Sequence, residues 1–130
     1  MMDFLNLDES LHTAIRISKA IAREYGNAVY TPSHLLRSLL HKDVGISAFV
    51  ESLGKDVAYL TEWADVHIES CEKLSGVSDI EADPRIASVF EEADNVRLKL
   101  GLLQINPICV LCALAKPETG YSSDQLKSFP

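Results

Sequence analysis

A histidine and a pair of cysteines are the side chains of this sequence that could perform catalysis or redox chemistry. His34 lies in the first turn of a predicted helix and could act as a general base. Cys109 and Cys112 have the C-x-x-C spacing at the start of another predicted helix, whose N-terminus would lower the pKa of a thiol. The positions 75 residues earlier hold His34 and Arg37, which are not thiols, and no βαβ pattern surrounds the pair. We therefore expect a structural, half-buried His34 that bonds to a neighbouring loop, and cysteines that pack as small apolar residues.

Carboxylates and the single tryptophan are the remaining candidates. Glu91-Glu92 and Asp94 lie on one predicted helix, where an acidic run is expected to be a solvated face unless a pocket perturbs the pKa of its carboxyl groups. Trp63 lies on the apolar stripe of its helix, which indicates packing in the core or between repeats. Zinc would need about four ligands, and Cys71 and the histidines do not provide that pattern. The sequence therefore predicts no catalytic, metal-binding or cofactor-binding residue.

Composition limits the kind of protein that can hold these residues. The 130 residues are 47% hydrophobic and 24% charged, as in a soluble globular domain. The net charge of −7 would repel a phosphate backbone, so nucleic acid is excluded as an expected partner. Three cysteines are an odd number, which fits a reducing compartment better than a secreted disulfide framework. Neither a signal peptide nor an apolar run of about 20 residues is present, so we expect a cytoplasmic protein without a membrane partner.

Apolar residues recur in steps of three and four through most of the sequence, which predicts an all-α fold. Capping residues and glycines bound the expected helices. These helices cover about residues 8–25, 32–40, 46–53, 56–71, 84–100 and 107–114, and residues 73–83, which show no clean period, form a linker. His34, Trp63, the acidic run and the three cysteines all fall on these helices or at their ends.

The two halves of the chain repeat each other. Gly26 and Gly101, Pro32 and Pro107, and the apolar positions after them are all separated by 75 residues. Such an offset indicates an internal duplication. We expect one domain over 1–130, with a first four-helix repeat over 8–72, the linker over 73–83 and a second repeat over 84–130. The second repeat lacks its last helix, so either the natural polypeptide continues or this copy is shorter.

The repeated segment carries a resemblance to a known family. Residues 31–40 read TPSHLLRSLL and residues 106–114 read NPICVLCAL, and this double repeat, which covers nearly the whole chain, resembles the Clp N-terminal domain of ClpB/ClpV-type AAA+ unfoldases. The resemblance implies a domain that is not itself an enzyme and that passes substrates or adaptors to a hexameric ATPase. ATP and Mg²⁺ would then be cofactors of the parent protein, because this sequence has no G-x-x-x-x-G-K-[ST] loop. The isolated domain is expected to be a monomer.

Departures from the family pattern reduce the range of partners that we expect. The branch that reads phosphorylated arginine has a glutamate where this chain has Ser33 and Ile108, and neither residue can pair with a guanidinium group. The disaggregase branch has acidic residues in its substrate groove where this chain has Leu102 and Ile108. An apolar surface suits the apolar face of a partner helix. This suggests the branch that serves type VI secretion, in which the domain grips a helix of the contracted sheath.

A predicted partner-binding groove follows from this comparison. It combines an N-terminal segment with the loop after the second glycine, and its residues are Phe4, Leu5, Leu7, Asp8, Leu11, Leu102 and Leu103. Recognition there would be of the helix-in-groove kind. The alternative for Leu102-Leu103 is that both side chains close the core between the repeats. Two other functions stay open, a stand-alone helical interaction domain and a thiol-dependent redox protein that uses Cys109 and Cys112.

Overall fold

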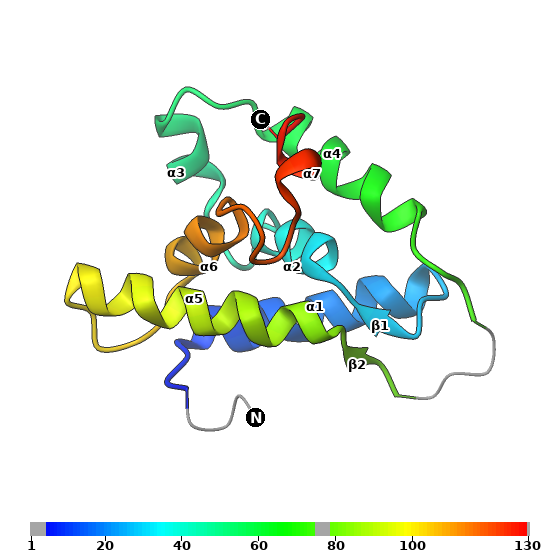
Figure 1. Ribbon diagram of the computed structural model, residues 1–130, viewed down its shortest axis with the longest axis horizontal. Coiled ribbons are helices and arrows are strands. Elements are labelled where there is room, and N and C mark those ends of the chain that lie inside the picture. The colour runs from blue at the N-terminus through cyan, green and yellow to red at the C-terminus, as the bar shows by residue number, and fades with distance from the viewer. Residues whose placement is uncertain (1–4, 75–78, 130) are drawn as a thin grey trace.

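The computed structural model describes residues 5–74 and 79–129, and within them it is built mainly from helices (Figure 1). The predicted all-α class is confirmed. Two short strands accompany the helices. The elements are α1 (Glu9–Glu24), β1 (Val29–Tyr30), α2 (Pro32–Leu39), α3 (Ser47–Ser52), α4 (Val57–Glu69), β2 (Glu81–Ala82), α5 (Pro84–Leu100), α6 (Pro107–Leu114) and α7 (Ser123–Leu126).

Side chains next to the helix ends explain where these helices begin and stop. The carboxylate of Asp8 accepts a hydrogen bond from the first turn of α1, and Asp83 and Asn106 do the same for α5 and α6. These caps satisfy backbone N–H groups that have no partner within the helix. Gly101 ends α5 in the left-handed backbone conformation, with φ of 70°, which residues with a Cβ rarely adopt.

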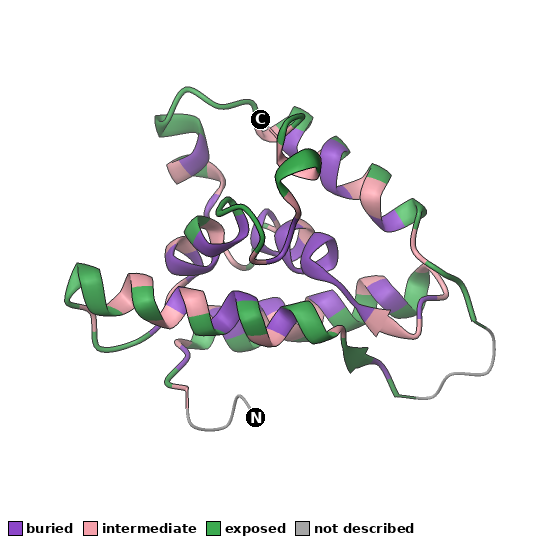
Figure 2. Ribbon diagram, viewed as in Figure 1, coloured by how far each residue is buried: buried purple, intermediate pink, exposed green. Residues whose placement is uncertain are grey.

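Helix α2 forms the centre of the molecule. It packs against α1, α4, α5 and α6, and Figure 2 shows it almost entirely in the colour of buried residues. Leu35, Leu36 and Leu39 have no exposed surface. Because seven of its eight residues are buried, this helix depends on the surrounding helices for its stability.

Two parallel backbone pairings cross between the halves of the chain. Strand β1 pairs with β2, with Tyr30 opposite Ala82, and a separate bridge joins Leu7 to Ile105. Residues 7 and 82 are 75 positions apart, as are residues 30 and 105 and the bounds of α2 and α6. In each half, the segment before the long helix therefore pairs with the segment before the second helix of the other half. This arrangement fits the predicted duplication, which stays a prediction together with its boundaries.

Trp63 confirms the expected packing between the halves. Its indole N–H donates to Ser128 over 2.9 Å, and its ring lies 4.9 Å from the rings of both Tyr121 and Phe129. The side chain is 6% exposed. The tryptophan of α4 thus holds the C-terminal segment in place.

In the part of the chain that the structure describes, no helix is both long enough and apolar enough to span a bilayer.

Candidate functional site

The structure brings together the two segments of the predicted groove. Two backbone hydrogen bonds form the Leu7–Ile105 bridge, and in the first the N–H of Asp8 donates to the carbonyl of Ile105 over 2.9 Å. The N–H of Ile105 donates in turn to the carbonyl of Asn6 over 2.8 Å. The side-chain amide of Asn6 donates to the carbonyl of Leu103 over 3.1 Å. The N-terminal segment therefore fixes the conformation of the loop that follows α5.

Several of the predicted groove residues do not face solvent. Leu7 is 9% exposed and Leu11 is 0% exposed. The prediction that these two side chains contact a partner is wrong for this conformation, because both lie in the hydrophobic core. Asp8 is the N-cap of α1, and its carboxylate accepts a hydrogen bond from the N–H of Leu11 over 2.9 Å. Leu5 is half-buried against the core, and Phe4 lies outside the described residues.

Three of the exposed large apolar side chains lie instead at the end of α5, which is at the far left of Figure 1, and the others lie elsewhere in the described chain. Leu98 is 61% exposed, Leu100 is 56% exposed and Leu103 is 89% exposed, whereas Leu102 is half-buried against the core. We call these four residues the leucine tip. A guanidinium N–H of Arg97 donates to the carbonyl of Leu102 over 2.9 Å, which holds the loop against the helix.

The leucine tip includes two residues that the sequence reasoning did not place in the site. Leu98 lies off the apolar stripe of its helix, and Leu100 was expected on that stripe. The signal that could have identified them is four leucines within residues 98–103, around a glycine that ends the helix. A partner-binding role for Leu5, Leu102 and Leu103 stays a prediction.

His34 is fully buried rather than half-buried, and it bonds to a loop as expected. Its Nδ1 accepts hydrogen bonds from the backbone N–H of Thr31 at 2.9 Å and from the Thr31 hydroxyl at 2.8 Å. The proton therefore lies on Nε2, which donates to Oδ1 of Asn27 over 2.9 Å. Burial lowers the pKa of His34 from 6.5 to about 4, although the carboxylate of Asp83 opposes the shift. An imidazole that is neutral, saturated with hydrogen bonds and shielded from solvent has a structural role.

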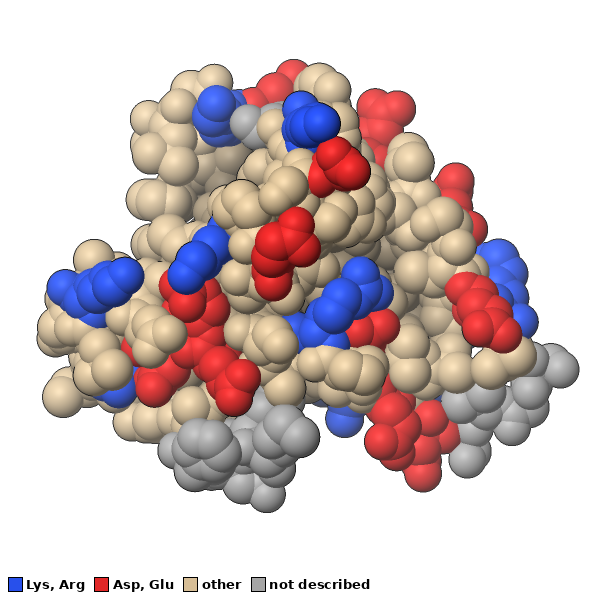
Figure 3. Space-filling model, viewed as in Figure 1, with Lys and Arg blue, Asp and Glu red and all other residues tan. Residues whose placement is uncertain are grey.

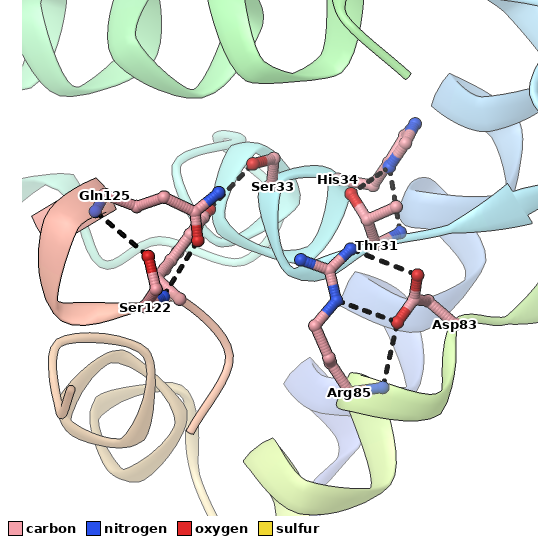
Figure 4. A network of polar contacts seen from close by, with 8 residues as sticks. Thr31, Ser33, His34, Asp83, Arg85, Ser122 and Gln125 are labelled. Carbon is pink, nitrogen blue, oxygen red and sulfur yellow. Dashed lines mark hydrogen bonds and ion pairs between the residues drawn. The ribbon is translucent and has the colours of Figure 1, made fainter. Parts of the chain in front are cut away.

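A polar network surrounds the start of α2 and connects it to the second half of the chain (Figure 4). The hydroxyl groups of Ser33 and Tyr121 lie 2.8 Å apart, and burial raises the pKa of Tyr121. Arg85 donates from Nε and Nη2 to the two carboxylate oxygens of Asp83 over 3.0 and 3.1 Å. Burial alone would raise the pKa of Asp83, but the hydrogen bonds and the charge of Arg85 hold that pKa below its usual range. These groups satisfy one another, so the network stabilises the junction of the halves.

The cysteines do not have the environment of a redox site. Cys109 is fully buried, whereas Cys112 is exposed, which differs from the expectation that both are buried. The backbone N–H of Cys109 donates to Oδ1 of Asn106, which caps the helix. Partial burial raises the pKa of Cys112, and the neighbouring Cys109 raises it further. Reactive cysteines have lowered pKa values, so the geometry does not favour thiol chemistry.

The acidic run lies on the surface of α5 among cations. Glu92 pairs with the ammonium of Lys116 at 3.2 Å, and Asp94 pairs with Arg97 at 2.7 Å. A hydrogen bond from Asn95 lowers the pKa of Glu92, and Lys116 lowers it further. On the face drawn in Figure 3, acidic and basic side chains are interspersed in the same way. Glu92 and Asp94 thus belong to ion pairs at the surface, as expected for a solvated helix face.

Comparisons with known proteins show the family of the chain. The family model of the Clp repeat (R) N-terminal domain matches residues 6–129. The chaperone protein ClpB of Brucella suis is 27% identical over 129 residues, which are 98% of this chain but only 15% of that protein.

Solved structures show the same fold. The N-terminal domain of ClpV1 ATPase from the E. coli EAEC Sci1 T6SS superposes with a TM-score of 0.79, at 16% identity, over 95% of this chain and 76% of that chain. A structure described as a peptide from the EAEC T6SS Sci1 SciI protein has a TM-score of 0.75, at 18% identity, over 85% of this chain and 70% of that chain. With a family match over almost its whole length, the chain belongs to the Clp repeat (R) N-terminal domain family.

Proposed function

We propose that this chain is a non-catalytic recognition domain of a ClpB/ClpV-type AAA+ unfoldase and that the leucine tip contacts its protein partner. The observation that carries the proposal is the 89% exposure of Leu103 in a loop held by backbone pairing. The partner is a protein substrate, an adaptor or a helix of a type VI secretion sheath. The chain spans about 15% of the length of its ClpB relatives, so the ATPase and its hexameric ring would belong to the rest of a longer protein.

The exposure of the leucine tip and the fixed conformation of its loop support protein recognition. Clustered leucines in water favour association with another apolar surface, because their burial removes apolar area from water. The loop is already fixed by the Leu7–Ile105 bridge and by Arg97. A fixed loop loses little conformational freedom when a partner binds, which increases the net binding free energy.

Resemblance to the secretion branch supports a helical partner. The matched ClpV1 domain comes from a type VI system, and another matched structure is described as a peptide of the SciI protein of such a system. In this chain the tip offers leucines, and Ser33 is uncharged and bonded to Tyr121. These features suit an apolar helix face better than a phosphorylated arginine.

The test compares binding by the chain and by two aspartate variants. The ligands are a synthetic sheath-protein helix and a reduced, carboxymethylated model protein, and the readout is the dissociation constant from fluorescence anisotropy. Burial of a leucine is worth about 1.5–3 kcal/mol, so Leu103→Asp should weaken binding by about tenfold or more. Val66→Asp is the matched control, because Val66 is 58% exposed on α4 and lies outside the tip. If Leu103→Asp binds both ligands as tightly as the unmodified chain, the proposed function is wrong at this surface.

A further inference from the structure

A row of basic side chains runs along the exposed face of α1. Its members follow one another at steps of four, three and four residues, which places them on one side of the helix: His12, Arg16, Lys19 and Arg23. All four are exposed, and within the described residues none of them forms an ion pair. The chain has a net charge of −7, so a row of unpaired basic groups contrasts with its overall charge. We call these four residues the α1 ridge.

A second row, which is acidic and apolar, runs along the exposed face of α4. Its members follow one another at steps of three, four and three residues: Tyr59, Glu62, Val66 and Glu69. Tyr59 is 55% exposed and Val66 is 58% exposed. Glu62 and Glu69 form no ion pair within the described residues, and α4 contains no lysine or arginine. We call these four residues the α4 ridge.

The two ridges face away from each other within one chain. Helices α1 and α4 both pack on α2, and in Figure 1 α4 lies at the upper right while α1 lies lower, behind α5. Ile17 and Ile21 of α1 line a groove together with Asp65 of α4, which is bonded to Arg37. Among the described residues that line this groove, none belongs to either ridge. The bases of the α1 ridge therefore meet the acids of the α4 ridge only when two copies of the chain come together.

We propose that the α1 ridge of one copy of this chain binds the α4 ridge of a second copy. Charge complementarity carries the proposal, because the charged groups of both ridges lack ion-pair partners in their own described chain. The ridges also match in length, since each extends for about 15 Å at a rise of 1.5 Å per helical residue. In the contact, the aliphatic stems of Arg16 and Lys19 would cover Tyr59 and Val66 while their charged ends reach the glutamates.

This contact joins two different surfaces, so it is heterologous and repeats from copy to copy as a ring or an open row. Ion pairs at an exposed surface are individually weak, so the isolated chain should associate only at high concentration. In the hexameric parent protein, which is a step that rests on the proposed function, neighbouring copies would be tethered side by side. Tethering gives an effective concentration of about a millimolar, at which a weak contact still forms.

The experiment is sedimentation equilibrium of the unmodified chain and of two charge-reversal variants in low salt. One variant carries Arg16→Glu with Lys19→Glu, and the other carries Glu62→Lys with Glu69→Lys. At about 1 mM the unmodified chain should show an average mass above that of the 14.3 kDa monomer. Each variant should associate about tenfold more weakly, because like charges then face each other. Sodium chloride at about 0.5 M should also weaken association of the unmodified chain.

Two control variants change the net charge equally and leave both ridges intact. Lys42→Glu with Lys55→Glu matches the variant of the α1 ridge, and Glu81→Lys with Glu91→Lys matches the variant of the α4 ridge. All four positions are exposed, and none of them forms an ion pair within the described residues. Both controls should keep the affinity of the unmodified chain within about threefold, because a specific contact depends on where the charges lie.

An equimolar mixture of the two charge-reversal variants provides the most specific test. Alone, each variant has two ridges of like charge. In the mixture, the acidic α1 ridge of one variant faces the basic α4 ridge of the other, so association should return. Leu103→Asp should leave the association of the otherwise unmodified chain unchanged, which separates this proposal from the function proposed for the leucine tip.

Three results would overturn the proposal. The first is an unmodified chain that remains monomeric at about 1 mM in low salt. The second is an association that only one of the two charge-reversal variants weakens, since the contact would then not join α1 to α4. The third is a mixture of these two variants that remains monomeric.

Discussion

Acidification should destabilise this protein through His34. The buried imidazole accepts the backbone N–H of Thr31 at Nδ1 and donates from Nε2 to Asn27. Protonation of Nδ1 would place two N–H donors against each other inside the protein. Burial lowers the pKa of His34 from 6.5 to about 4 in the folded state, although the carboxylate of Asp83 opposes the shift.

The magnitude follows from the two pKa values. A group whose pKa is lower in the folded state stabilises the protein above its unfolded pKa, because below that value the unfolded chain takes up the proton first. The contribution of His34 is therefore complete above about pH 6.5 and is lost as the pH falls toward about 4. Between pH 7 and pH 5 the free energy of unfolding should decrease by about 2 kcal/mol from this residue alone.

The assay is urea unfolding at pH 7 and pH 5, followed by the fluorescence of the single tryptophan, Trp63. His34→Gln provides the reference, because a glutamine at the third helical position can accept the same capping hydrogen bond but does not titrate. Carboxyl groups contribute equally to both proteins, so the difference between the two pH responses isolates the histidine. If both proteins lose the same free energy of unfolding between pH 7 and pH 5, the reasoning is refuted.

Three further changes test the packing and the cysteines. Gly120→Ala would place a Cβ 2.8 Å from Cγ2 of Val89, so it should lower the free energy of unfolding by about 1–3 kcal/mol in urea, and Val89→Ala should recover part of this loss. Trp63→Ala removes the ring between the halves and should cost about 3–5 kcal/mol, measured by thermal melting; a loss below about 1 kcal/mol would contradict its packing role. Iodoacetamide at neutral pH should alkylate Cys112 more slowly than a free thiol, because the pKa of Cys112 is raised. Cys109 should react only after unfolding, and mass spectrometry of the native protein would reveal any faster reaction.

Local signals made most helices predictable from the sequence. Asp8, Asn106 and Gly101 act within one helical turn, as an N-cap, an N-cap and a left-handed stop. Such residues set the ends of a helix with little dependence on the rest of the protein. The expected starts of α1 and α6 and the expected end of α5 were therefore accurate.

Long-range pairings were not predictable in the same way. Strands β1 and β2 have two residues each, which is too short for a periodic pattern, and β2 lies in the segment expected to be a linker. For the same reason the sequence did not show that Leu7 pairs with Ile105 and turns inward. The stripe of α1 indicated that Leu11 lies on the apolar face of the helix, but not that Leu11 is completely buried. The groove prediction failed at Leu7 and Leu11 because the spacing of apolar residues shows which of them share a face. It does not show how much of that face is exposed to solvent.

The crossed backbone pairings have a consequence for how the chain folds. Leu7 pairs with a residue 98 positions away, and Tyr30 pairs with a residue 52 positions away. Contacts between distant residues form only after long loops have closed, which slows folding. Each half depends on the other for the backbone pairing of the segments before its helices, so the halves should not fold as independent units. We expect folding to be a single cooperative transition whose rate depends on when the ends of the chain meet.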